Sequence, residues 1–242
     1  MIGSRPRYEQ VVSLGYFCST ALELQRYGFR DASYPFDWNI SPIEAVLRLL
    51  DSGFEGHMRR ESLVRDPVNA KIVRNTSTGI AMYNDFVPES SLDEQYAEVS
   101  EKYARRIERL QLAIRQRTLF VRYMVNLEEH RYLEENMAGV MAILRAPNPL
   151  NDLVLVSNDD LPPSCGGRRV FTVSVDENDD VARAFLRKNR ELSQRMLLLP
   201  YPMSRRLRNL YVFRQTLVAA KARAFLQRLG VGQLLKRLGL RA

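Results

Sequence analysis

The stretch VVSLGYFCSTALELQRYGFRDASYPFDW, residues 11–38, predicts the strand, turn and helix that decide the fold. Its two opening valines begin a short apolar run that Gly15 interrupts. From Cys18 onward apolar residues recur at helical spacing, and Gly28 ends that pattern. Cys18 is therefore expected in the first turn of a helix, where free backbone N–H groups and the helix dipole stabilise a thiolate.

Helices and strands alternate along the rest of the chain. Helices are expected at 42–50, 92–117 and 127–144, and Ser41 is expected as the N-cap of the first. Strands are expected at 80–83, 119–125, 153–157 and 170–175. The segment 57–78 is expected to form loops or short strands. Such alternation indicates an α/β fold with a mostly parallel sheet flanked by helices. Residues 11–14 and 119–125 are apolar enough to be interior strands.

Polar residues follow several of the apolar runs. Gly15 to Cys18, Asn84-Asp85 and the segment 158–160 each come where an expected strand ends, and Asp37 lies between Phe36 and Trp38. Ligands of parallel α/β sheets bind outside the carboxyl ends of the strands. The Cys18 turn, Asp37 and Asn84-Asp85 are therefore expected to meet in one cleft.

These residues resemble the motifs of a bacterial domain family of unknown function, labelled putative papain-like cysteine peptidase. The shared motifs are Ser-Leu-Gly-x-x-Cys at 13–18, Asp-Trp at 37–38, Asn-Asp-Phe at 84–86 against the family's His-Asp-Phe, Arg-Arg-Ile-Glu-Arg at 105–109, and Leu-Phe-Val-Arg at 119–122. The resemblance covers residues 11–175. Asn84 stands where the family shows histidine, and an amide cannot act as the base, which would remove about 10²- to 10⁴-fold of general-base catalysis.

The resemblance implies a thiol-dependent hydrolase or acyl transferase. It assigns catalytic roles to Cys18, Asp37 and Asp85, and substrate binding to Gly15, Trp38 and Asn84. Cys18 would attack, one of the two aspartates would orient the reacting groups, and backbone N–H groups after Gly15 would form the oxyanion site.

Each of these residues also has a structural alternative. Cys18 is also consistent with a buried thiol or one that lines a ligand site. Asp37 and Asp85 are also consistent with helix caps or turn residues. His57 is the one substitute base that the sequence offers, whereas His130 is typical of a solvated helix face and Cys165 of a bystander.

A second class of function therefore remains open. The chain would then be a non-peptidase α/β transferase or binding protein of envelope polysaccharide assembly, acting on a phosphorylated or nucleotide-linked substrate held at a helix N-terminus. A non-catalytic binding module follows if Cys18 is inert. No cofactor is expected, because two histidines and two cysteines without a paired spacing give a catalytic zinc site little support.

Length and composition bound the organisation of the chain. With 242 residues, 45% of them hydrophobic, it can bury one sizeable core. Two unpaired cysteines favour a reducing cytosol over a disulfide framework. Residues 1–10 lack the apolar run of a signal peptide, and no stretch approaches the roughly 18 apolar residues of a spanning helix, so a cytoplasmic location is expected. We expect a domain at 7–199 followed by a tail at 204–242.

The tail carries the excess of positive charge. The chain has 36 basic and 28 acidic residues. No acidic residue occurs after position 203, where the basic ones are Arg205, Arg206, Arg208, Arg214, Lys221, Arg223, Arg228, Lys236, Arg237 and Arg241. Apolar residues recur among them at helical spacing and predict a basic amphipathic helix. Such a helix packs on its own domain, binds an anionic membrane surface, or, least expected without a recognisable motif, binds nucleic acid.

Overall fold

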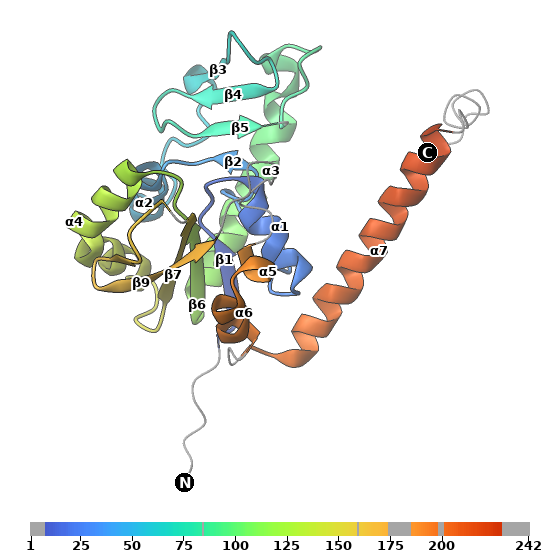
Figure 1. Ribbon diagram of the computed structural model, residues 1–242. Helices are drawn as coiled ribbons and strands as arrows, with labels where there is room; N and C mark the ends of the chain where they lie inside the picture. Colours follow the sequence, from blue (N-terminus) through green and yellow to red (C-terminus); the bar gives the residue numbers. More distant parts are fainter. Residues whose placement is uncertain (1–7, 84, 159, 174–184, 198–200, 229–242) are drawn as a thin grey trace.

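The computed structural model describes residues 8–83, 85–158, 160–173, 185–197 and 201–228 (Figure 1). Its main sheet contains β1 (Gln10–Ser13), β6 (Thr118–Tyr123), β7 (Asp152–Asn158), β9 (Arg168–Val173) and β8 (Ser164–Cys165), in that spatial order. Neighbours from β1 to β9 pair in parallel, and β8 pairs antiparallel with β9. The expected α/β fold with a mostly parallel sheet is confirmed.

Helices cover both faces of this sheet and bury an apolar core on each. One core holds α2 (Ile43–Asp51), α4 (Leu127–Arg145) and the end of α3 (Leu92–Ile114). The other holds α1 (Cys18–Arg26), α5 (Phe185–Lys188) and α6 (Arg190–Leu197). All six residues of β6 are buried, as expected of a parallel strand with both faces covered.

The position of β1 was predicted wrongly. Among the described strands, β1 pairs with β6 alone and forms the edge of the main sheet, although 11–14 was expected to be an interior strand. Val12 lies in one core and Val11 in the other, so both faces of the strand are nevertheless covered. Apolar character reports that burial, but it does not distinguish an interior strand from a covered edge strand.

A second, antiparallel sheet lies beside the N-terminal part of α3 (Figure 1). It contains β2 (Asn39–Ile40), β5 (Ala81–Tyr83), β4 (Ile72–Asn75) and β3 (Leu63–Arg65), in that order, and β3 is preceded by the short helix η1 (Arg60–Ser62). The expected strand at 80–83 is present. However, a short turn joins β4 to β5, and such a connection allows only antiparallel pairing. The sequence pattern predicted that Asp85 follows a strand of the parallel sheet. It instead comes after β5 of the antiparallel sheet.

The helix ends differ slightly from the expected ones. Pro42, not Ser41, occupies the N-cap position of α2, and the hydroxyl of Ser41 makes no capping bond. A capping box of Ser91 and Glu94 begins α3. Along α3, Glu101 and Arg105 form an ion pair on the exposed side.

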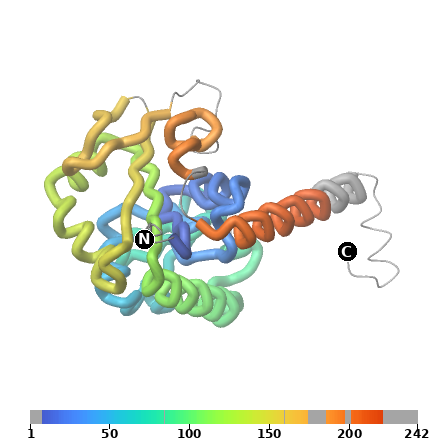
Figure 2. The backbone as a smooth tube through the Cα atoms, turned by 90° about the horizontal axis from the view of Figure 1, so that it is seen from below, coloured from blue at the N-terminus to red at the C-terminus, as the bar shows by residue number. Residues whose placement is uncertain are grey.

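The C-terminal helix α7 (Met203–Arg228) leaves the body after its first turns (Figures 1 and 2). Those turns dock on the end of α1. Arg206 donates to the carbonyl of Tyr27 at 2.9 Å, and Asn209 donates to that of Gly28 at 3.1 Å. Gly28 has φ +74°, and a Cβ there would lie 2.6 Å from the carbonyl oxygen of Arg206. Glycine thus permits both the end of α1 and the close approach of α7.

In the part of the chain that the structure describes, no helix combines the length and apolar character needed to cross a bilayer. The proposed boundary at residue 199 and the segment after residue 228 lie outside the described residues. The division into a domain and a tail stays a prediction.

Candidate functional site

The turn between β1 and α1 depends on glycine at position 15. Gly15 has φ +86°, and a Cβ there would lie 2.1 Å from the hydroxyl oxygen of Ser41. Its N–H donates to the hydroxyl of Ser13 at 3.1 Å. A side chain would be strained and would also displace Ser41, so glycine lets the turn pack against the residues that precede α2.

A buried arginine of β6 forms hydrogen bonds to the backbone next to this turn. Arg122 of β6 is fully buried, and its Nη1 donates to the carbonyls of Leu14 at 2.6 Å and Ser41 at 2.8 Å. Its Nε lies 2.5 Å from a carboxylate oxygen of Glu129 in α4. The guanidinium also lies 5.7 Å from the ring centre of Tyr16. One side chain therefore joins the end of β1, the start of α2 and α4.

Sequence reasoning missed the role of Arg122. Arg122 was noted only as the last residue of a family motif. The sequence feature that could have revealed its role is a charged residue within an otherwise apolar strand. Buried charges require partners, so a cation at such a position predicts a polar contact without naming it.

Cys18 is the first residue of α1, as the sequence predicts. Its side chain is partly buried, and it is a free thiol. Phe17 occupies the N-cap position and supplies no side-chain acceptor, so the first N–H groups of α1 have no cap. Among the described residues, no side chain makes a hydrogen bond to the sulfur of Cys18. The thiol thus lies at the positive, uncapped end of a helix.

Asp37 is enclosed by its partners. It is fully buried, and one oxygen accepts from Nε and Nη2 of Arg30 at 2.9 and 2.8 Å and from the N–H of Tyr34 at 2.8 Å. Burial raises the pKa of Asp37, and Arg30 opposes that shift. Arg30 also lies 5.4 Å from the ring of Trp38, which is partly buried. Asp37 holds the turn from Tyr34 to Trp38 in one conformation.

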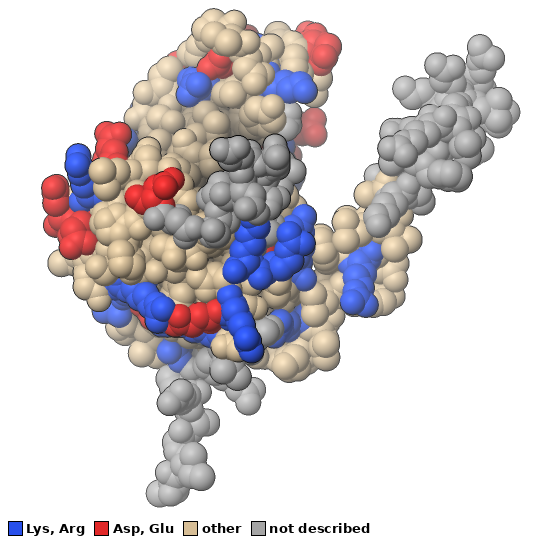
Figure 3. Space-filling view, in the orientation of Figure 1, with Lys and Arg blue, Asp and Glu red and all other residues tan. Residues whose placement is uncertain are grey.

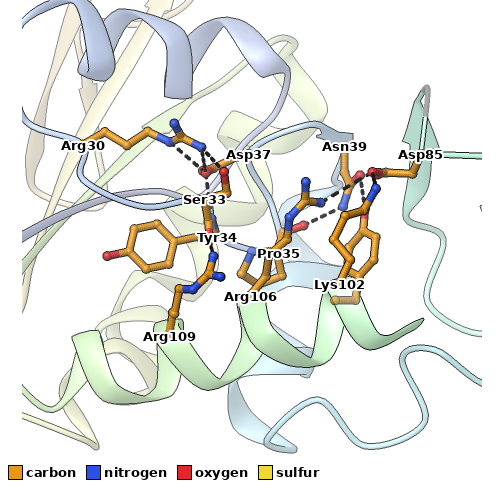
Figure 4. A network of polar contacts seen from close by, with 11 residues as sticks. Arg30, Ser33, Tyr34, Pro35, Asp37, Asn39, Asp85, Lys102, Arg106 and Arg109 are labelled. Carbon is orange, nitrogen blue, oxygen red and sulfur yellow. Dashed lines mark hydrogen bonds and ion pairs between the residues drawn. The ribbon is translucent and has the colours of Figure 1, made fainter. Parts of the chain in front are cut away.

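Asp85 is surrounded by side chains of α3 (Figure 4). Lys102 Nζ lies 2.6 Å from one carboxylate oxygen, and Arg106 lies 3.6 Å from the same oxygen. The hydroxyl of Tyr103 is 2.6 Å from the other oxygen and 2.8 Å from the amide oxygen of Asn39. Burial and the charge of Asp85 raise the pKa of Tyr103 well above its ordinary value, so this phenol stays neutral.

One face of α3 connects the two carboxylates. Arg109 reaches the carbonyl of Ser33 at 3.4 Å, in the turn that Asp37 holds, and Arg106 lies between Asp37 and Asp85 (Figure 4). The Arg-Arg-Ile-Glu-Arg motif therefore directs two arginines into the network and one, Arg105, toward solvent. No hydrogen bond joins Cys18 to either carboxylate among the described residues, and Asn84 lies outside them.

The two imidazoles are engaged elsewhere. His57 is buried between the rings of Phe54 and Tyr103, at 5.9 and 5.7 Å, and neither ring nitrogen has a partner among the described residues. Burial lowers its pKa to about 4. His130 is buried in α4, with Nε2 2.8 Å from the carbonyl of Ser164, so its assignment to a solvated helix face was wrong. Neither ring makes a hydrogen bond to Cys18.

Comparison with known families identifies this region. The model of the family described as "Putative papain-like cysteine peptidase (DUF1796)" matches residues 9–156. The chain belongs to this family. The DUF1796 match runs from β1 to β7, and it includes Cys18, Asp37, Asp85 and Arg122. Comparison with curated proteins and with solved structures finds no match.

Proposed function

We propose that this DUF1796 protein is a thiol-dependent enzyme that uses Cys18 for hydrolysis or acyl transfer. The observation that carries the proposal is the position of the thiol. Cys18 lies at the uncapped start of α1, on a turn that Gly15 and Arg122 hold in one conformation. Unpaired N–H groups at a helix start stabilise a thiolate, and the thiolate is the reactive form of cysteine.

The reaction would follow the usual course of thiol catalysis. The thiolate of Cys18 attacks the substrate carbonyl, a C–S bond forms, and the leaving group departs with a proton. Water or another acceptor then cleaves the acyl-thiol bond and restores the cysteine. The N–H groups after Gly15 would bind the oxyanion, while Trp38 and Asn84 would line the substrate site.

The two aspartates are assigned different roles in this proposal. Asp37 is enclosed by Arg30 and backbone, which supports a positioning role for the turn that precedes Trp38. Asp85 contacts Lys102 and Tyr103 in the middle of α3, and these groups would orient a substrate or the residue at position 84.

Selective alkylation of the native full-length chain tests the proposal. Iodoacetamide below neutral pH should label Cys18 ahead of Cys165, which is fully buried and whose pKa burial raises to about 12. Peptide mass spectrometry quantifies each site, and Cys18→Ser provides the control. Labelling of Cys18 only at alkaline pH would mean an ordinary thiol and would contradict the proposal.

A second candidate is a non-peptidase transferase or binding protein of envelope polysaccharide assembly. Two observations favour it: no imidazole makes a hydrogen bond to Cys18 among the described residues, and the main sheet is mostly parallel, unlike the antiparallel barrel of papain. The uncapped start of α1 would then bind a phosphorylated or nucleotide-linked substrate. Uridine diphosphate should raise the melting temperature of both the native chain and Cys18→Ala. The absence of a shift in both would exclude this candidate.

We also propose that α7 attaches the protein to an anionic membrane surface, at the cytoplasmic face. Several apolar side chains of α7 are exposed: Leu207 by 59%, Tyr211 by 64% and Val218 by 64%. Arg208 and Arg214 are exposed among them, and Lys and Arg side chains gather where α7 leaves the body (Figure 3). Exposed apolar groups beside cations suit a lipid interface better than a nucleic acid, which needs the charge alone.

Vesicle cosedimentation tests the attachment with the full chain. Native protein should bind vesicles that contain phosphatidylserine and should be released by 1 M salt, where the Debye length falls to about 3 Å. Arg208→Glu with Arg214→Glu should abolish binding, whereas Arg59→Glu with Arg115→Glu on the body should not. Equal binding by both double variants, or binding of duplex RNA but not of vesicles, would contradict the proposal.

A further inference from the structure

A cluster of three metal-binding side chains lies where α4 meets β8. His130 and Glu134 are one turn apart on that helix, and Cys165 is in β8. One ligand atom from each residue lies within 4.8 Å of the other two. It is the one group of three or more such ligands in the described ranges. Because the cysteine is distant in sequence from the other two residues, no spacing motif predicts the cluster.

The backbone brings Cys165 to α4 through a tight turn. Gly166 has φ +53°, and a Cβ there would lie 2.3 Å from the Cβ of Met137. The N–H of Gly166 donates to the carboxylate of Glu134, and the sulfur of Cys165 lies 3.5 Å from the carbonyl of His130. The turn after β8 is therefore packed directly on the helix, and the thiol points at the ligands of α4.

We propose that Cys165, His130 and Glu134 bind a zinc ion, with water as the fourth ligand. Zinc accepts sulfur, nitrogen and oxygen at about 2.3, 2.0 and 2.1 Å in a tetrahedron, so its ligand atoms are about 3.3 to 3.6 Å apart. The separations in the cluster come into this range after a side-chain movement of about 1 Å. A thiolate and an imidazole together favour zinc over magnesium or calcium, which prefer oxygen ligands.

The surroundings of the cluster support this choice. The carbonyl of Ser164 lies 2.8 Å from Nε2 of His130 and orients the ring. Ligating histidines commonly donate one ring N–H to such a carbonyl, which leaves the other nitrogen for the metal. Cys165 and His130 are buried, whereas Glu134 is exposed. The exposed carboxylate gives a metal and its water a route from solvent.

Metal binding would exchange a proton for zinc. The Cys165 thiol would release its proton to solvent as the S–Zn bond forms, so apparent affinity should rise with pH. The bound ion would hold the β8 turn on α4 next to Glu129, the partner of Arg122.

Cobalt substitution in the full chain tests the site independently of any activity. After treatment with a chelator, one equivalent of Co²⁺ should give thiolate-to-metal charge-transfer absorption and the visible bands of tetrahedral cobalt, and Zn²⁺ should remove both. Cys165→Ser should abolish the charge-transfer band. Glu134→Gln, at an exposed position, should fold normally and weaken binding by about tenfold or more. The matched control Glu135→Gln and Cys18→Ser should bind cobalt as the native chain does.

Three results would overturn the inference. One is the absence of a thiolate band in the native chain. Another is a band that survives in Cys165→Ser but disappears in Cys18→Ser, because the metal would then occupy the start of α1. The third is equal affinity of Glu134→Gln and the native chain.

Discussion

Replacement of Arg122 by methionine would measure how strongly this side chain holds the turn that carries Cys18. The guanidinium has three partners: the Glu129 carboxylate at 2.5 Å and the carbonyls of Leu14 at 2.6 Å and Ser41 at 2.8 Å. Arg122→Met leaves all three acceptors without their donor inside the protein. Each orphaned buried carbonyl costs about 1–3 kcal/mol. Removal of one partner from a buried ion pair costs about 3–5 kcal/mol.

These costs describe the same side chain and are not additive, so we expect a loss of about 4 kcal/mol in the free energy of unfolding. Urea unfolding of the full chain, followed by the fluorescence of the single tryptophan and by helical circular dichroism, measures it. With a slope of about 1–3 kcal/mol per molar urea, the midpoint should fall by more than about 1 M.

Two further variants separate this explanation from a general loss of positive charge. Arg105→Met breaks the exposed pair with Glu101 and should change the unfolding free energy by less than about 0.5 kcal/mol. The double variant Arg122→Met, Glu129→Leu should be more stable than Arg122→Met alone, because no unpaired carboxylate remains. A loss below about 1 kcal/mol in Arg122→Met, or a double variant no more stable than the single one, would refute the reasoning.

Three more predictions follow from the described contacts. Burial lowers the pKa of His57 to about 4 in the folded chain, against an ordinary 6.5. Between these values the unfolded chain binds more protons, so the free energy of unfolding falls as pH drops from 6.5 to 4. His57→Phe should reduce this fall by up to about 3 kcal/mol in acid titrations of unfolding. Asn84→His should create or raise thiol-dependent hydrolysis of ester and peptide substrates, and Cys18→Ala should remove that gain. An Asn84→His variant without hydrolytic activity would favour the non-peptidase candidate. Gly28→Ala should detach α7, seen as faster proteolysis within 203–228 while the body stays folded, and unchanged proteolysis would contradict the close packing against Arg206.

The elements of the main sheet were largely predictable because their signals are local. β6 is largely apolar apart from Arg122, β7 has an apolar run at 153–156, and α3 and α4 keep one apolar face over many turns. The second sheet was predicted only in part. The strand at 80–83 was expected and corresponds to β5, but β2 has two residues, which is too few for alternation to be recognised. Whether β1 lies at an edge likewise depends on which strands pair with it.

The candidate site was likewise predictable only where its features depend on neighbouring residues. A thiol in the first turn of a helix could be read from residues 15–28, because glycine and helical spacing are properties of neighbouring residues. The partners of Asp85 could not be read, since they come from α3, and nothing local marked Arg30, seven residues before Asp37, as the partner of that carboxylate. Arg122 illustrates the limit best, because its acceptor Leu14 is 108 residues away.

The sequence by itself determined the family, the α/β class, the place of Cys18 at a helix start and the basic character of the C-terminal segment. The tertiary structure alone decided that Arg122 lies beneath the Cys18 turn, that Cys165 meets His130 and Glu134, and that α7 leaves the body after its first turns. Propensity, capping and periodicity act between residues a few positions apart. Buried cations, carbonyls and metal ligands are paired by chain segments that meet only when the core packs, and no local pattern encodes which segments those are.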